Sequence, residues 1–109
     1  MRIAFTAHIR EGERERLEKR FRDGPPFDPE EAGFDHHAVF LGDTDITFLF
    51  EGEDPLPAVR KLAARPGLLR DVLDLAGAVT PPHLMREVYS WSRDSDSDAV
   101  AGGVPAQMR

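Results

Sequence analysis

Hydrophobic and polar residues alternate at the start of the chain, as they do in a β-strand with one buried face. Residues 2–9 form this segment, and its most apolar side chains share one face: Ile3, Phe5, Ala7 and Ile9. The charged segment that follows, residues 11–22, changes to a helical period that places Leu17 and Phe21 on one face. The pattern therefore predicts a strand and then a mostly solvated helix, which Gly24 ends.

Two apolar runs in the middle of the chain give the strongest local signal. Residues 36–41 and 46–51 are rich in β-branched and aromatic side chains, and only residues 42–45 separate them. A connection of this length predicts a β-hairpin. Residues 27–34, which contain a proline and a glycine, are expected to form a loop before it.

The rest of the chain predicts two helices and a last strand. Asp54 and Pro55 are typical of a helix start. Residues 68–76 repeat apolar side chains at helical spacing, so we expect an amphipathic helix packed firmly on the rest of the domain. Alternation over residues 84–92 predicts the fourth strand. One face of that strand would carry three notable side chains: Glu87, Tyr89 and Trp91.

This order of elements predicts an α+β domain of the ferredoxin-like β-α-β-β-α-β type over residues 1–92. Its four-stranded antiparallel sheet would place the fourth strand beside the first, followed by the third and the second. The helices would cover only one face of the sheet. The opposite face is too apolar to remain in water, so we expect a second copy of the chain to cover it and form a homodimer.

Composition and charge narrow the possible partners. The 109 residues carry a formal net charge of −6, which argues against nucleic acid or an anionic membrane as a partner. The absence of cysteine excludes thiolate nucleophiles and cysteine-bound metals. Residues 1–20 contain no apolar run of the length of a signal peptide or a membrane span, so we expect a cytoplasmic location. Residues 93–109 are expected to form a disordered tail.

Four short segments carry a resemblance to a known superfamily. They are residues 2–6, the hairpin over residues 39–52, the helix break at residues 64–67 and residues 85–89. Together these segments resemble the dimeric α+β-barrel superfamily, in which two such sheets face each other. The resemblance implies the ferredoxin-like fold, a homodimer and a small-molecule ligand.

Within that superfamily the chain is similar to antibiotic-biosynthesis monooxygenases, to L-rhamnose mutarotases and to SchA/CurD-like proteins of aromatic polyketide clusters. Mutarotases of this kind have a histidine after an arginine near the end of the first helix. Here the run is Lys19-Arg20-Phe21-Arg22, without a histidine. This departure argues against a sugar mutarotase activity.

Histidine is the residue type best suited to chemistry in this chain. The sequence contains no glycine-rich phosphate loop, no His-Glu-x-x-His motif and no nucleophile elbow. His8 lies on the polar side of the first strand, from which it would point into the face opposite the helices. There it would meet Thr6 and Thr47, with Glu51 as the orienting carboxylate of a catalytic pair. The alternative is a buried histidine that is hydrogen-bonded for structural reasons.

Further side chains are candidates for binding a substrate. His36 and His37 are neighbours on a strand and leave it by opposite faces, so only one of them can face a cavity. The last strand would line either an apolar pocket or a dimer interface with three side chains: Glu87, Tyr89 and Trp91. The acidic residues 51–54 are more typical of a helix start than of a metal site. We therefore expect neither a metal nor a cofactor.

The leading hypothesis is a small-molecule-binding barrel in which His8 acts as a base, helped by Glu51 or a second histidine. Cofactor-independent oxygenation, cyclisation and isomerisation of a small apolar or aromatic substrate all require such a base. The alternative is a non-catalytic homodimer that serves as a ligand sensor or as an accessory protein of a pathway. Haem or metal binding is a third hypothesis.

Overall fold

A computed structural model of the chain describes residues 1–93. Its elements follow one another in this order: β1 (Arg2–His8), α1 (Arg14–Arg22), β2 (His36–Leu41), β3 (Asp45–Glu51), α2 (Pro55–Ala63), the 3-10 turn η1 (Pro66–Leu68), α3 (Leu69–Ala78) and β4 (His83–Arg86). The fold is α+β, and the predicted order of strands and helices is confirmed. Of the predicted tail, residues 94–109 lie outside the described residues.

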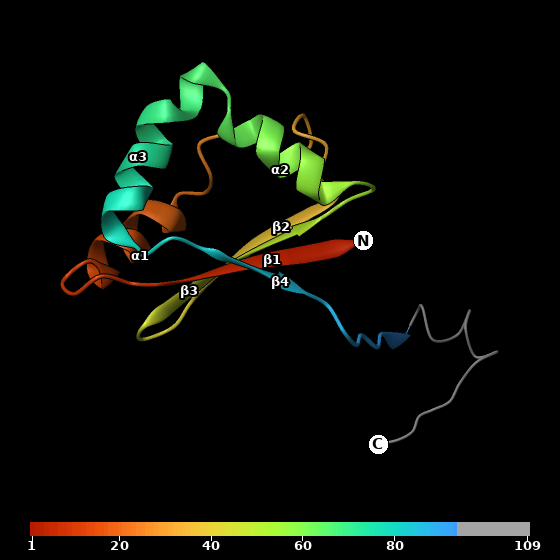
Figure 1. Cartoon of the computed structure of the whole chain (residues 1–109), viewed down its shortest axis with the longest axis horizontal. Coiled ribbons are helices and arrows are strands. Elements are labelled where there is room, and N and C mark those ends of the chain that lie inside the picture. The colour runs from red at the N-terminus through yellow and green to blue at the C-terminus, as the bar shows by residue number, and fades with distance from the viewer. Residues whose placement is uncertain (94–109) are drawn as a thin grey trace.

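The four strands form one antiparallel sheet in the order β2-β3-β1-β4, as the sequence predicts. Strand β1 pairs with β3 along its whole length, from Arg2 opposite Glu51 to His8 opposite Asp45. The helices lie on one side of this sheet (Figure 1). The arrangement is compatible with a ferredoxin-like fold.

Alternation along β1 and β3 produces the hydrophobic core between the sheet and the helices. Ile3 and Ala7 of β1 are buried on the same face as Ile46, which is fully buried in β3. Leu17 of α1 packs into the same core and is the only buried residue of its helix. Removal of these side chains from water supplies the main stabilisation of the fold.

Helix α1 begins three residues later than the sequence pattern suggests. Gly12 has a φ of +83°, which no right-handed helix contains, so residues 11–12 form a turn and the helix starts at Arg14. At the other end, Gly24 has a φ of +95° and its N–H donates to the Phe21 carbonyl oxygen over 3.1 Å. The predicted glycine end of the helix is therefore confirmed.

Strand β4 is shorter than predicted, because it ends at Arg86 and not near Ser92. Its partner strand explains the difference. Ile3 pairs with Arg86, and β1 begins only one residue earlier at Arg2, so no further backbone is left for residues 87–92 to pair with. Tyr89 and Trp91 consequently lie beyond the sheet, with 75% and 56% of their surfaces exposed.

Helix α3 is present where it was expected, but it is not firmly packed. Leu69 and Leu73 are 56% and 62% exposed, and only Ala78 is buried within the helix. Val72 and Leu75, on the side nearer the sheet, line an open cavity. The prediction of tight packing was wrong because the apolar residues of this helix occupy more than one face, and the cavity lies beneath one of them.

Candidate functional site

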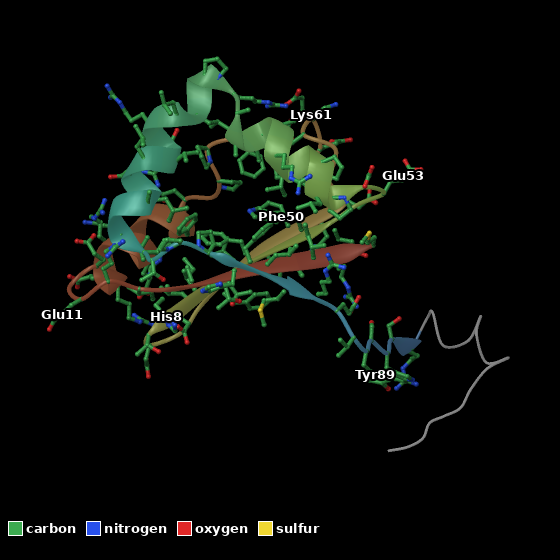
Figure 2. All side chains as sticks on the ribbon, viewed as in Figure 1. His8, Glu11, Phe50, Glu53, Lys61 and Tyr89 are labelled. Atoms are coloured by element: carbon green, nitrogen blue, oxygen red, sulfur yellow. The ribbon has the colours of Figure 1, made fainter. Side chains whose placement is uncertain are left out.

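The structure contains an apolar cavity of about 280 Å³ between the sheet and the helices. We call it the interior pocket. Its floor and roof are formed mainly by six side chains: Phe5, Phe48 and Phe50 from the sheet, and Leu62, Val72 and Leu75 from the helices. Figure 2 shows Phe50 on this side of the sheet and His8 on the other. An apolar pocket of this kind accepts the apolar surface of a ligand.

His37 contributes an imidazole to the wall of the interior pocket. In the register of the sheet it lies opposite Phe50 on the face that the helices cover. Its ring stacks on the Phe50 ring, with centroids 4.5 Å apart and planes 20° apart, and lies 5.4 Å from the Phe27 ring. The His37 Nδ1 atom is 2.9 Å from the carbonyl oxygen of Leu49. Aromatic packing and this hydrogen bond fix the orientation of the ring.

The contact with Leu49 determines which nitrogen of His37 is available for a ligand. A carbonyl oxygen only accepts hydrogen bonds, so Nδ1 must donate its proton to it. In the neutral ring the lone pair then resides on Nε2. Burial lowers the pKa of His37, an effect that the hydrogen bond to Leu49 opposes and the nearby His36 reinforces. The pocket therefore presents a neutral imidazole whose Nε2 accepts a proton or a hydrogen bond.

An ion-pair network closes one side of the interior pocket by joining α1 to α3. Arg20 of α1 pairs with Asp71 of α3, and both residues line the pocket. Asp74 pairs with Arg20 over 3.4 Å and with Arg16 over 3.0 Å. These contacts hold the two helices together at the rim, while the space beneath them stays open.

His8 lies on the opposite face of the sheet, which we call the open face. Its Nδ1 atom is 2.5 Å from a carboxylate oxygen of Asp45, and its side chain is 69% exposed. Glu51 lies at the other end of the same strand pair, opposite Arg2. The two positions are six residues apart along the strands, or about 20 Å. The structure thus gives His8 a carboxylate partner, but that partner is Asp45 and not Glu51.

Thr6 and Thr47 face each other in the middle of the open face, as the predicted strand pairing requires. Their hydroxyl oxygens are 3.0 Å apart. His8 follows two residues later on β1, so the threonines and His8 share a face, as predicted. The threonine hydroxyls bond to each other rather than to the imidazole.

The remaining predicted site residues are dispersed. His36 is exposed on the open face, while His37 points to the helices, so the two do leave by opposite faces. Glu87 forms an ion pair with Arg2 over 2.5 Å at the edge of the sheet. Tyr89 and Trp91 are exposed beyond β4 and do not line the interior pocket. Of the predicted set, only His37 lies in this pocket.

The sequence contains a signal for a buried histidine in the interior pocket. His37 alternates with Val39 and Leu41, the apolar face of its strand, rather than with the polar face. A histidine among apolar inward positions indicates a buried imidazole. The contribution of Asp45 was missed, although it begins the third strand directly opposite the end of the first.

Among the described residues, no group of three or more histidine, aspartate or glutamate side chains is placed to hold a metal ion. Over the same residues, no helix combines the length and the apolar character needed to cross a membrane. Comparisons with protein-family models, with curated proteins and with solved structures found no match to the chain.

Proposed function

We propose that the protein binds a small, largely apolar or aromatic molecule in the interior pocket and contacts it with Nε2 of His37. One observation carries the proposal. An apolar cavity of about 280 Å³ has a neutral, oriented imidazole in its wall. Small-molecule sites are commonly apolar cavities in which a few polar groups fix the orientation of the ligand.

The chemistry that this arrangement favours is the acceptance of a proton. The lone pair on Nε2 of His37 is suited to an O–H group or an acidic C–H group of the ligand, because the ring is neutral at physiological pH. Cofactor-independent oxygenation, cyclisation and isomerisation all require a base that forms a carbanion or enolate of the substrate. The proposed reaction class is the one inferred from the sequence, with His37 replacing His8 as the base.

A non-catalytic role as a ligand sensor or accessory protein is the second candidate, and one observation favours it. The group that orients His37 is a backbone carbonyl and not a carboxylate. A backbone carbonyl stabilises an imidazolium less than a carboxylate does, so the pair is a weaker base than a histidine–aspartate pair. Turnover of a bound ligand distinguishes the two roles, and both require the same pocket.

We further propose that a second copy of the chain covers the open face. Phe40 and Met85 lie on this face and are 59% and 52% exposed. Across the sheet, Met85 of β4 is aligned with three further apolar residues of this face: Ala4, Leu49 and Ala38. An apolar surface of this kind is more stable when it is buried against a partner. This surface supports the predicted homodimer. The cytoplasmic location stays a prediction from the sequence.

Binding of the fluorescent probe N-phenyl-1-naphthylamine tests the function of the interior pocket. Leu75→Trp fills the pocket, because Leu75 lines it from α3. Leu73→Trp is the matched control, since Leu73 is on the same helix and is 62% exposed. We expect saturable binding to the wild type and to Leu73→Trp, and binding to Leu75→Trp that is weaker by about tenfold, which corresponds to about 1.4 kcal/mol.

Two outcomes would contradict the proposal. One is a wild-type protein that does not bind the probe, and the other is equal binding to both tryptophan variants. Near-ultraviolet circular dichroism of each variant establishes that it is folded, so that weaker binding by Leu75→Trp reports on the pocket.

A further inference from the structure

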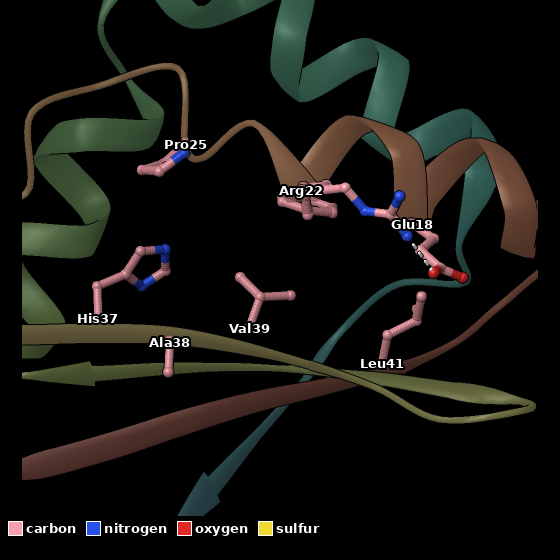
Figure 3. Close-up of a pocket in the computed structure, with 8 residues that line it drawn as sticks. Glu18, Arg22, Pro25, His37, Ala38, Val39 and Leu41 are labelled. Atoms are coloured by element: carbon pink, nitrogen blue, oxygen red, sulfur yellow. Dashed lines mark hydrogen bonds and ion pairs between the residues drawn. The ribbon is translucent and has the colours of Figure 1, made fainter.

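A second cavity, of about 380 Å³, lies between helix α1 and the edge strand β2. We call it the edge groove. Figure 3 shows His37 at one end of it and the Glu18–Arg22 pair near Leu41 at the other. Between these ends the floor is apolar and includes Val39. The groove therefore joins an apolar surface to a charged one.

The edge groove and the interior pocket have three lining residues in common: Phe21, Pro25 and His37. The two cavities therefore meet at these side chains. In Figure 3 one ring nitrogen of His37 points toward the strand and the other points away from it, toward the groove. Because Nδ1 is bound to Leu49, the nitrogen directed away from the strand is Nε2. A ligand that occupied both cavities would pass this nitrogen.

The charged end of the edge groove carries the ion pair of Glu18 and Arg22. Glu18 accepts hydrogen bonds from two guanidinium groups, Arg14 over 3.0 Å and Arg22 over 2.7 Å. Glu18 is thus shared between Arg22, which lines the groove, and Arg14, which does not. Because Glu18 neutralises Arg22 only in part, an anionic ligand group beside Arg22 would be favoured over a neutral one.

Arg22 uses fewer of its hydrogen-bond donors than Arg14 does. Arg14 makes a second bond, from Nε to the carbonyl oxygen of Gly42 over 2.9 Å, whereas the hydrogen bond of Arg22 described in the structure is the one to Glu18. A guanidinium carries five N–H donors and matches the geometry of a carboxylate. The Arg22 side chain is 71% exposed, so a carboxylate reaches it from solvent.

We propose that the edge groove is a subsite for the carboxylate of an amphipathic ligand whose apolar part occupies the interior pocket. This inference rests on the proposed function of the interior pocket and specifies the ligand class. His37 and Leu41, at the two ends of the groove floor, are four residues apart on β2, or about 13 Å. The ligand is thus an elongated carboxylic acid whose chain runs along the groove floor from Arg22 toward His37 and the interior pocket.

Displacement of N-phenyl-1-naphthylamine by decanoate and by decanol tests the inference, because the two compounds have the same chain and differ in the charged group. We expect decanoate to bind the wild type about two- to fivefold more tightly than decanol, the range of an exposed ion pair. Arg22→Gln should abolish this preference, and 0.5 M salt should reduce it. Arg60→Gln, which removes an equal charge from an exposed position of α2, should preserve it.

A second variant moves the preference in the opposite direction. Glu18→Gln removes the carboxylate that competes for Arg22, so the preference for decanoate should increase. Equal binding of decanoate and decanol to the wild type would overturn the inference and leave the proposed function intact. If neither compound displaces the probe, the carboxylate subsite is overturned, and binding of the probe itself still decides the proposed function. An unchanged preference in Arg22→Gln would also overturn the carboxylate subsite.

Discussion

Replacement of His37 by asparagine should make the stability of the protein less sensitive to acid. Burial lowers the pKa of His37 in the folded state, whereas the unfolded chain has the ordinary value of about 6.5. Well above pH 6.5 the ring is neutral in both states, so stability does not depend on its titration. As the pH falls below that value, the unfolded chain takes up the proton first, and the free energy of unfolding decreases.

The size of the effect is limited by the uptake of one proton. Between the unfolded and the folded pKa of His37, the free energy of unfolding falls by at most about 1.4 kcal/mol per pH unit, and below the folded pKa this decrease stops. Because the side chain is only half-buried, water reduces the effect below this limit. Asparagine does not titrate, and its amide nitrogen is suited to keep the hydrogen bond to the Leu49 carbonyl.

Urea unfolding between pH 5 and 8 measures the difference directly. We expect the wild type to lose more stability than His37→Asn below pH 6.5, and the two curves to run parallel above pH 7. His36→Asn is the matched control, because it replaces the neighbouring histidine on the open face. It leaves His37 buried, and burial is the main cause of the lowered pKa of His37. Parallel curves for the wild type and His37→Asn over the whole range would refute the account of a buried, neutral imidazole.

Two further predictions concern the open face and the packing of the hairpin. Phe40→Asp should convert a homodimer into a folded monomer in sedimentation velocity, because it places a charge on the apolar open face. Leu73→Asp on α3 should leave the dimer intact. A wild-type protein that sediments as a monomer would contradict the dimer. Gly52→Ala should destabilise the fold by roughly 1–3 kcal/mol in urea unfolding, since a Cβ atom there would lie 2.9 Å from the backbone oxygen of Gly33. Gly77 lies within α3 and has open space around it, so Gly77→Ala should instead stabilise the protein by about 0.5–1 kcal/mol. Equal effects of the two substitutions would contradict the packing described for Gly52.

The sheet could be predicted from the sequence because its signals are local. Alternation over residues 36–41 and 46–51, with a short connection between them, specifies a hairpin and its two faces. The position of β1 beside β3 follows from the order of the elements. The end of β4 could not be predicted, because it depends on where β1 begins and not on the residues of β4 itself.

The site was less predictable, because a cavity depends on how far packed elements stand apart. The alternation of β1 correctly placed His8 on the open face, but it contains no information on the space between α3 and the sheet. That space arises because α3 presents Val72 and Leu75 to the sheet without filling the interval, and no periodicity in the sequence reports such a gap. His37 was among the predicted residues, yet its role depends on the Leu49 carbonyl, which only the pairing of β2 with β3 brings within reach.

Methyl NMR of the wild-type protein titrated with N-phenyl-1-naphthylamine is the most direct test of where a ligand binds. Leu62, Val72 and Leu75 carry methyl groups on the wall of the interior pocket, and Leu49 lies on the open face. The account predicts that the signals of the first three residues shift with the probe concentration and that the signals of Leu49 stay in place. Shifts at Leu49 without shifts at the other three residues would place the site on the open face and contradict the account.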